Sequence, residues 1–189
     1  ATLNVLDDHA FSGFYLTLAI AGGGMPALFT PSPALDGWSA MLGTYYAEFS
    51  ALLPSIDVAV RLRITAPWDT PFLVIHASFE NTASAPASLA LNAASDFHPA
   101  VEVDANPHAV DAFTARGSAM FTDALGDAGD YFLASGPDWE SRRILNTLTL
   151  SRTLDIKPGA SCEDTFLLGA SPRCSVDWLE QQRAQFTPT

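Results

Sequence analysis

The chain has 189 residues, with 21 acidic and nine basic side chains, so its formal net charge is −12. Hydrophobic residues make up 48% of the chain and charged residues 16%, a balance typical of one folded domain and not of a disordered chain. The excess of carboxylates repels phosphate groups, so we expect neither nucleic acid nor an anionic membrane as a partner.

Strands are predicted along most of the chain, because apolar and polar residues alternate with a period of two. Leu16, Leu18 and Ile20 indicate an early strand, and 44–49 is typical of a strand at a sheet edge. The clearest alternation is in 56–64, where one face carries Ile56, Val58, Val60, Leu62 and Ile64. Further strands at 72–80 and 88–93 follow turns rich in Pro, Asn and Ser, so the three predict an antiparallel meander.

The second half of the chain continues the same pattern. Weaker strands are expected at 101–103, 110–114, 119–122 and 131–134. A long strand is predicted over 144–156, with one face formed by Ile144, Leu148, Leu150, Leu154 and Ile156. Pro158 and Gly159 occupy the central positions of a type II turn, which leads to a returning strand at 164–168.

One helix is predicted, at the end of the chain. Ser175 is a suitable N-cap for a helix that runs from Trp178 to Gln185, and Asp177 suits its first turn. Many strands followed by one short helix predict an all-β fold, an antiparallel two-sheet sandwich with a C-terminal helix. We expect the sandwich domain to cover 1–174 and the helix or linker to cover 175–189.

Two cysteines and one apolar segment bear on the setting of the protein. Cys162 and Cys174 form a disulfide if the chain is exported or remain thiols if it is cytosolic, and the sequence leaves both open. The most apolar segment, 14–28, contains Gly22–Gly24 and Pro26, so it is not expected to cross a bilayer as a helix.

Four short segments resemble a known family. They read ITAPWDTP at 64–71, ENTASAP at 80–86, LDIKPGA at 154–160 and DTFLLG at 164–169. With the strands between them, they resemble the N-terminal super-sandwich domain, of the galactose mutarotase-like type, of cellobiose and chitobiose phosphorylases and related bacterial glycosidases. The resemblance covers 56–94 and 148–186.

The resemblance implies an accessory role. In that family the catalytic acid and the phosphate-binding residues lie in a helical barrel. Residues 178–186 would correspond to the linker helix that leads into this barrel. It therefore implies a non-catalytic domain of an acidic protein that packs on a catalytic helical domain or a second protomer and helps shape a saccharide site. No catalytic residue and no cofactor are predicted for this chain.

Tryptophan side chains are the candidates for carbohydrate contact, since an exposed indole stacks on the apolar face of a sugar ring. Trp68 is the best candidate because Pro67 and Asp69 place it in a turn. Trp38 and Trp139 are the other two candidates. The alternative is that these indoles plug the ends of the sandwich. If they bind sugar without a catalytic partner, the chain is a stand-alone, lectin-like carbohydrate-binding module.

A metal-dependent β-sandwich enzyme is the remaining alternative. His98, Glu102 and His108 supply two imidazoles and a carboxylate within eleven residues, a donor set that suits a divalent metal. Their spacing matches no known metal motif. Two turn histidines beside two solvent-facing acids are the favoured explanation, so no metal is predicted.

Overall fold

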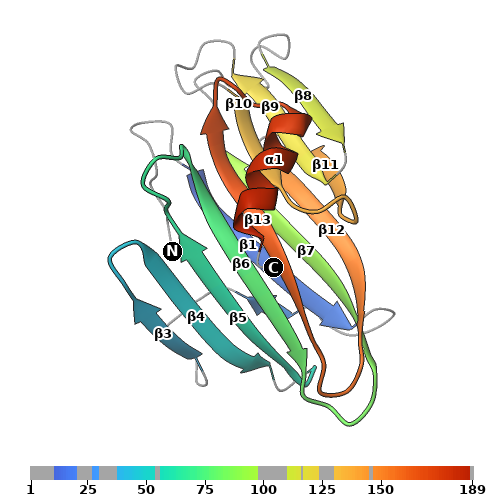
Figure 1. Ribbon diagram of the computed structural model, residues 1–189. Helices are drawn as coiled ribbons and strands as arrows, with labels where there is room; N and C mark the ends of the chain where they lie inside the picture. Colours follow the sequence, from blue (N-terminus) through green and yellow to red (C-terminus); the bar gives the residue numbers. More distant parts are fainter. Residues whose placement is uncertain are drawn as a thin grey trace.

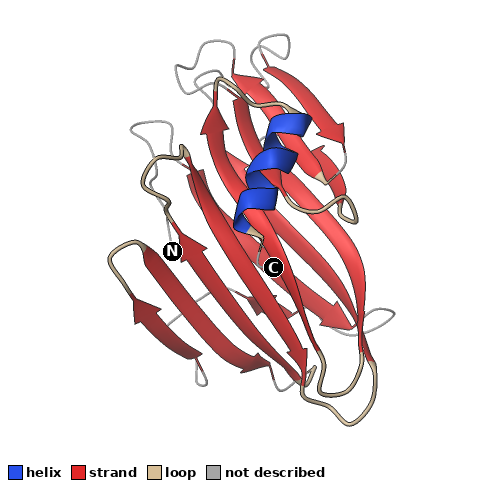
Figure 2. Ribbon diagram, viewed as in Figure 1, coloured by secondary structure: helices blue, strands red, loops and turns tan. Residues whose placement is uncertain are grey.

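The computed structural model describes residues 11–20, 27–29, 38–53, 56–97, 110–115, 117–123, 130–144 and 147–187. They form two antiparallel sheets packed face to face, with one helix on the outer side of the larger sheet (Figures 1 and 2). This arrangement confirms the predicted all-β sandwich with a C-terminal helix. Among the described residues no helix is long and apolar enough to span a membrane.

The smaller sheet has five strands in the order β11-β12-β7-β1-β2, and the larger has eight in the order β3-β4-β5-β6-β13-β10-β9-β8. The smaller sheet contains β1 (Phe11–Ile20), β2 (Ala27–Phe29), β7 (Ala87–Phe97), β11 (Glu140–Ile144) and β12 (Thr147–Ile156). The larger contains β3 (Trp38–Leu42), β4 (Tyr46–Leu53), β5 (Val58–Thr65), β6 (Phe72–Asn81), β8 (Val110–Ala115), β9 (Ser118–Asp123), β10 (Asp130–Ala134) and β13 (Ser161–Ser171).

The main core lies between the sheets and is built from the predicted apolar faces. Val58, Val60 and Leu62 of β5 are each at most 2% exposed, and Leu148 and Leu150 of β12 are fully buried. Burial of such side chains contributes about 1.5 to 3 kcal/mol each. The alternation of these strands therefore places Arg61 and Arg63 on the outer face of the larger sheet.

Three sequence predictions about strands are wrong. The three strands β5, β6 and β7 do not form one meander, because β5 pairs with β6 in the larger sheet, whereas β7 lies in the smaller sheet between β12 and β1. Ile144 does not share a long strand with Leu148: it ends β11, pairs with Thr147 at the start of β12, and is 62% exposed. The segment 44–49 does not form the sheet edge, because β4 lies between β3 and β5. These differences depend on where the chain turns and which strands then pair, and the alternation of apolar and polar residues does not predict either. The expected strand at 101–103 lies outside the described residues.

Asn81 connects the two turns that resemble the phosphorylase domain, one between β6 and β7 and the other between β12 and β13, each of which crosses from one sheet to the other. Its side-chain amide is buried and donates to the carbonyl oxygens of Ala85 (2.9 Å) and Ile156 (3.0 Å). Its backbone carbonyl accepts from the amide of Gly159, which has φ of 67° in the predicted Pro-Gly turn. The Asn-Thr and Pro-Gly turns are therefore joined by hydrogen bonds, which tie the end of β6 in the larger sheet to the end of β12 in the smaller sheet.

Helix α1 (Val176–Phe186) starts at the predicted cap, where the Ser175 hydroxyl accepts from the amide of Trp178 at 3.2 Å. Its buried residues, Val176 and Leu179, cover a second core on the outer side of the larger sheet. That core contains Phe72 and Val74 of β6, Met120 of β9, Phe132 and Ala134 of β10, and Leu167 of β13. One part of β6 and β13 is thus buried on both faces.

We expect Leu179→Ala to lower the free energy of unfolding by about 2 to 5 kcal/mol, because this leucine is 1% exposed and its removal leaves a cavity under the helix. Gln185→Ala, on the exposed side of the same helix, should change it by less than about 0.5 kcal/mol. Urea denaturation measures both. Equal small effects would mean that the helix is not packed on the sheet.

Candidate functional site: the open face of the larger sheet

The outer surface of the larger sheet beyond helix α1 is polar. We call it the open face; it consists of outward side chains of β3, β4, β5, β6 and the start of β13, namely Ser39, Glu48, Ser50, Arg61, Arg63, Thr65, His76, Ser78, Glu80, Ser161 and Glu163. Two hollows lie on it, of about 350 and 450 Å³. Figure 1 shows this part of the sheet uncovered, beside the helix.

Strand register arranges these side chains in cross-strand rows. Arg61 lies opposite Ser50 on β4 and Ser78 on β6, while Arg63 lies opposite Glu48 and His76. Directly opposed side chains in antiparallel strands are near enough to interact. Each guanidinium therefore has hydroxyl, carboxylate or imidazole groups on both sides.

Weak contacts hold the charged groups of the open face. The Nε of Arg61 is 3.8 Å from an oxygen of Glu48, and the guanidinium carbon of Arg63 lies 4.5 Å from the ring centroid of Tyr46. Exposed pairs of this kind contribute about 0 to 1 kcal/mol. The groups thus stay available to a ligand at small energetic cost.

His76 lines the larger hollow together with Glu48, Arg63 and Glu163. Its Nδ1 lies 3.2 Å from the hydroxyl oxygen of Thr165. Burial lowers the pKa of His76 below 6.5, the cation of Arg63 lowers it further, and Glu163 opposes the shift. At neutral pH the imidazole is therefore uncharged, with one nitrogen that donates and one that accepts.

Trp68 lies at one end of the larger sheet and is 89% exposed. Its ring is edge-on to Tyr45, with centroids 6.1 Å apart, and Tyr45 is itself 56% exposed. The amide of Ala66 donates to the carbonyl of Tyr45 at 3.0 Å, which joins the two turns. Trp38 begins β3, and its side chain lies outside the described part of the chain.

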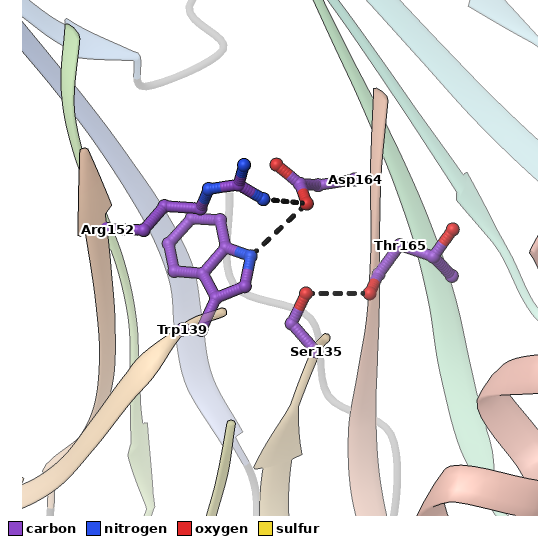
Figure 3. Close-up of polar contacts among 5 residues, drawn as sticks. All are labelled: Ser135, Trp139, Arg152, Asp164 and Thr165. Carbon is purple, nitrogen blue, oxygen red and sulfur yellow. Dashed lines mark hydrogen bonds and ion pairs between the residues drawn. The ribbon is translucent and has the colours of Figure 1, made fainter. Parts of the chain in front are cut away.

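Trp139 is not a surface residue, so its candidacy for carbohydrate contact needs correction. It is 2% exposed and packs edge-on against Phe166 with centroids 5.0 Å apart. Its Nε1 donates to Asp164 at 3.2 Å (Figure 3). The loop after β10 turns the indole between the sheets, where it plugs the sandwich and offers no face to a sugar.

An ion pair beside Trp139 links the two sheets, and the sequence analysis missed it. Arg152 of β12 donates to Asp164 of β13 at 2.9 Å, and the two side chains are 17% and 8% exposed. Figure 3 shows both groups beside the indole, with the Ser135 hydroxyl donating to the Thr165 carbonyl nearby. The sequence does contain a hint of this pair. Arg152 shares the period-two alternation of Leu148 and Leu150, so its charged side chain falls on the inward face of the strand.

Burial governs the protonation of Asp164. Desolvation raises the pKa of this carboxyl above the ordinary 3.8, against the opposing effects of Arg152 and of the hydrogen bond from Trp139. The second carboxylate oxygen of Asp164 and the Nε of Arg152 are buried and have no hydrogen-bond partner among the described residues. For the carboxyl of Asp164, desolvation thus outweighs the attraction of Arg152 and the hydrogen bond from Trp139.

The other predicted chemical groups have distinct outcomes. Cys162 and Cys174 are both free thiols, near opposite ends of β13, and burial raises the pKa of Cys174 to about 12. His98, Glu102 and His108 lie outside the described residues. Within the described ranges no group of three His, Cys, Asp or Glu side chains is placed to hold a metal ion.

No protein-family model and no curated protein matches the sequence. Solved structures do resemble the fold. A polysaccharide lyase matches 95% of this chain with 13% identity and a TM-score of 0.53, over 28% of its own length. A predicted kojibiose phosphorylase from the human microbiome matches 90% of this chain with 10% identity and a TM-score of 0.51, over 24% of its length.

A third structure, the Slr1438 protein of Synechocystis, matches 72% of this chain and 66% of its own, with 11% identity and a TM-score of 0.52. The chain thus spans about a quarter of the lyase and of the phosphorylase. At these identities the likeness concerns the fold, and it confirms the sandwich architecture that the sequence resemblance implied.

The buried pair can be tested by replacing one or both partners. Asp164→Leu should destabilise the protein by about 3 to 5 kcal/mol, because it leaves a guanidinium buried without its counter-charge. Arg152→Met combined with Asp164→Leu should restore the stability of the wild type or exceed it. Urea denaturation of both variants measures the difference, and a double variant as unstable as the single one would contradict this account.

The same pair predicts a pH dependence. Since the folded pKa of Asp164 is raised, its contribution to stability is present below the unfolded pKa and is lost as pH rises through the folded pKa. The advantage of the double variant over the wild type should therefore grow as pH rises from about 3 to 7. An advantage that shrinks over this range would mean that the pKa is lowered.

The protonation of His76 gives a separate test of the open face. Its NMR titration midpoint should lie below 6.5, and Arg63→Gln should raise it, because a nearby cation is removed. Arg142→Gln, on exposed β11, should leave it unchanged. Stability from neutral His76 is present above pH 6.5 and lost as pH falls through the folded pKa. A midpoint above 6.5 would contradict the assigned surroundings.

Proposed function

We propose that this chain is the non-catalytic accessory domain of a carbohydrate-active enzyme. The observation that carries the proposal is the size of the structural match. Nearly the whole chain corresponds to about a quarter of a polysaccharide lyase and of a predicted kojibiose phosphorylase. A β-sandwich that forms one part of a larger enzyme suits an accessory role.

The open face supports the proposed partner, a catalytic helical domain or a second protomer. It carries both signs of charge, with Arg61 and Arg63 among Glu48 and Glu163, and a row of serine and threonine hydroxyls. Interfaces between domains of one protein resemble transient protein interfaces and are comparatively polar. A polar, hollowed sheet face therefore fits such a contact.

Trp68 supports a role in shaping a saccharide site. An indole that is 89% exposed contributes little to the stability of the domain and offers its face to a ligand. Tyr45 beside it extends the aromatic surface and holds it edge-on. The second candidate function, a stand-alone carbohydrate-binding module, rests on the same aromatic pair and differs in needing no catalytic partner.

The activity of the isolated chain separates these functions from a catalytic one. Neutral and uronate-containing oligosaccharides, with and without inorganic phosphate, should remain intact when incubated with the purified protein. Lyase, phosphorylase or hydrolase products above a heat-inactivated control would contradict the non-catalytic role.

Trp68→Ala should weaken binding of neutral di- and trisaccharides of glucose and galactose tenfold or more, about 1.4 kcal/mol, with unchanged thermal stability. Leu42→Ala is a matched control, since Leu42 is 78% exposed near the same end of the sheet. Calorimetric titration measures both. Undiminished binding by Trp68→Ala, or no binding by the wild type, would remove Trp68 from the saccharide site.

A further inference from the structure

A groove of about 390 Å³ lies between the turn that joins β5 to β6 and the start of helix α1. Its apolar lining includes Pro71, Phe72 and Trp178, and its polar lining includes Asp69, Arg173 and Gln182. None of these residues belongs to the open face. Small-molecule sites of about 300 to 1,000 Å³ commonly combine an apolar floor with a few polar groups.

The aromatic floor of the groove is held in place by the second core. Trp178 meets Phe72 and Phe132 edge-on, with centroids 5.8 Å apart in both cases. Phe72 is 2% exposed, so it supports the floor from beneath, and the half-buried indole of Trp178 is the aromatic surface open to a ligand. A Cβ added to Gly169 would come within 2.5 Å of the Phe72 Cβ, so the backbone of β13 lies directly against Phe72. The floor is thus rigid before any ligand arrives, which lowers the entropic cost of binding.

Local hydrogen bonds hold the two walls. On one wall the Thr70 hydroxyl donates to the Phe72 carbonyl at 3.2 Å. On the other the backbone amide of Arg173 donates to the Ser171 hydroxyl at 3.1 Å. The turns that carry Asp69 and Arg173 are therefore ordered by their own contacts.

Three of the polar side chains that line the groove are unpaired among the residues that the structure describes. Within the described part of the chain, Asp69, Arg173 and Gln182 make no side-chain hydrogen bond or ion pair. Asp69 can only accept, Arg173 can only donate, and the Gln182 amide can do both. Together they offer both kinds of partner to a ligand above the aromatic floor.

We propose that this groove is a second binding site, for a neutral saccharide. A sugar ring has an apolar C–H face suited to the floor and hydroxyls that both donate and accept. An anion would meet Asp69, and a cation would meet Arg173, so the balanced walls favour an uncharged ligand. The inference uses the chemistry of the lining and holds whether or not the chain is an accessory domain.

Backbone and side-chain NMR of the wild-type protein, titrated with the neutral di- and trisaccharides named above, tests the site. The indole N–H of Trp178 and the side-chain amide of Gln182 should shift together and saturate. A uronate-containing disaccharide should bind with a dissociation constant at least tenfold higher. Stronger binding of the uronate would overturn the assignment of a neutral ligand.

Variants of exposed Arg173 and half-buried Gln182 separate the groove from the Trp68 site. Gln182→Ala and Arg173→Ala should each raise the dissociation constant read from the Trp178 shifts fivefold or more. Gln181→Ala and Arg142→Ala serve as matched controls. The shifts at Trp178 should persist in Trp68→Ala. The groove site would be overturned if no shifts appeared at Trp178, or if the control variants lost affinity equally. If Trp68→Ala loses only the shifts around residue 68, the result concerns the proposed function alone.

Discussion

Burial of β6 and β13 on both faces is the constraint on which the rest of the structure depends. Inward, Ile75 and Phe166 face the smaller sheet; outward, Val74 and Leu167 lie under helix α1. The outward residues of β6 change from apolar Phe72 and Val74 to polar His76, Ser78 and Glu80. The apolar part requires the helix as a cover, and the polar part is left as the open face. The boundary of the helix and the position of the groove both follow from that change.

The molecule uses opposite charges in two different ways. Between the sheets, Arg152 and Asp164 are desolvated, and the raised pKa of the carboxyl shows that burial outweighs their attraction. On the open face, the contact between Arg61 and Glu48 is partly exposed to solvent and contributes little to the free energy of unfolding. The interior pair thus joins β12 of one sheet to β13 of the other, whereas the surface groups remain exposed to a partner.

Local pattern predicted much of the fold, because apolar alternation reports burial on one face. It located β5, β6, β12 and the Ser175 cap. It was wrong where long-range pairing decides: Ile144 ends a strand because β11 and β12 form a hairpin, and Trp139 is buried because its loop turns between the sheets. The open face could not be assembled from sequence, since Glu48, Arg63 and His76 meet only through the register of three strands. Trp68 was placed correctly on the surface because its turn is local.

Charge balance distinguishes both candidate ligand surfaces from the chain as a whole. With a net charge of −12, most of the surface repels anions and attracts cations. The open face, however, places Arg61 and Arg63 among its acids, and the groove sets Arg173 against Asp69. Such local balance lowers the potential where a ligand would sit and leaves directional hydrogen bonding to decide what binds. In the groove this condition favours the uncharged, hydroxyl-rich ligand proposed for it, and on the open face it favours the polar protein contact proposed there.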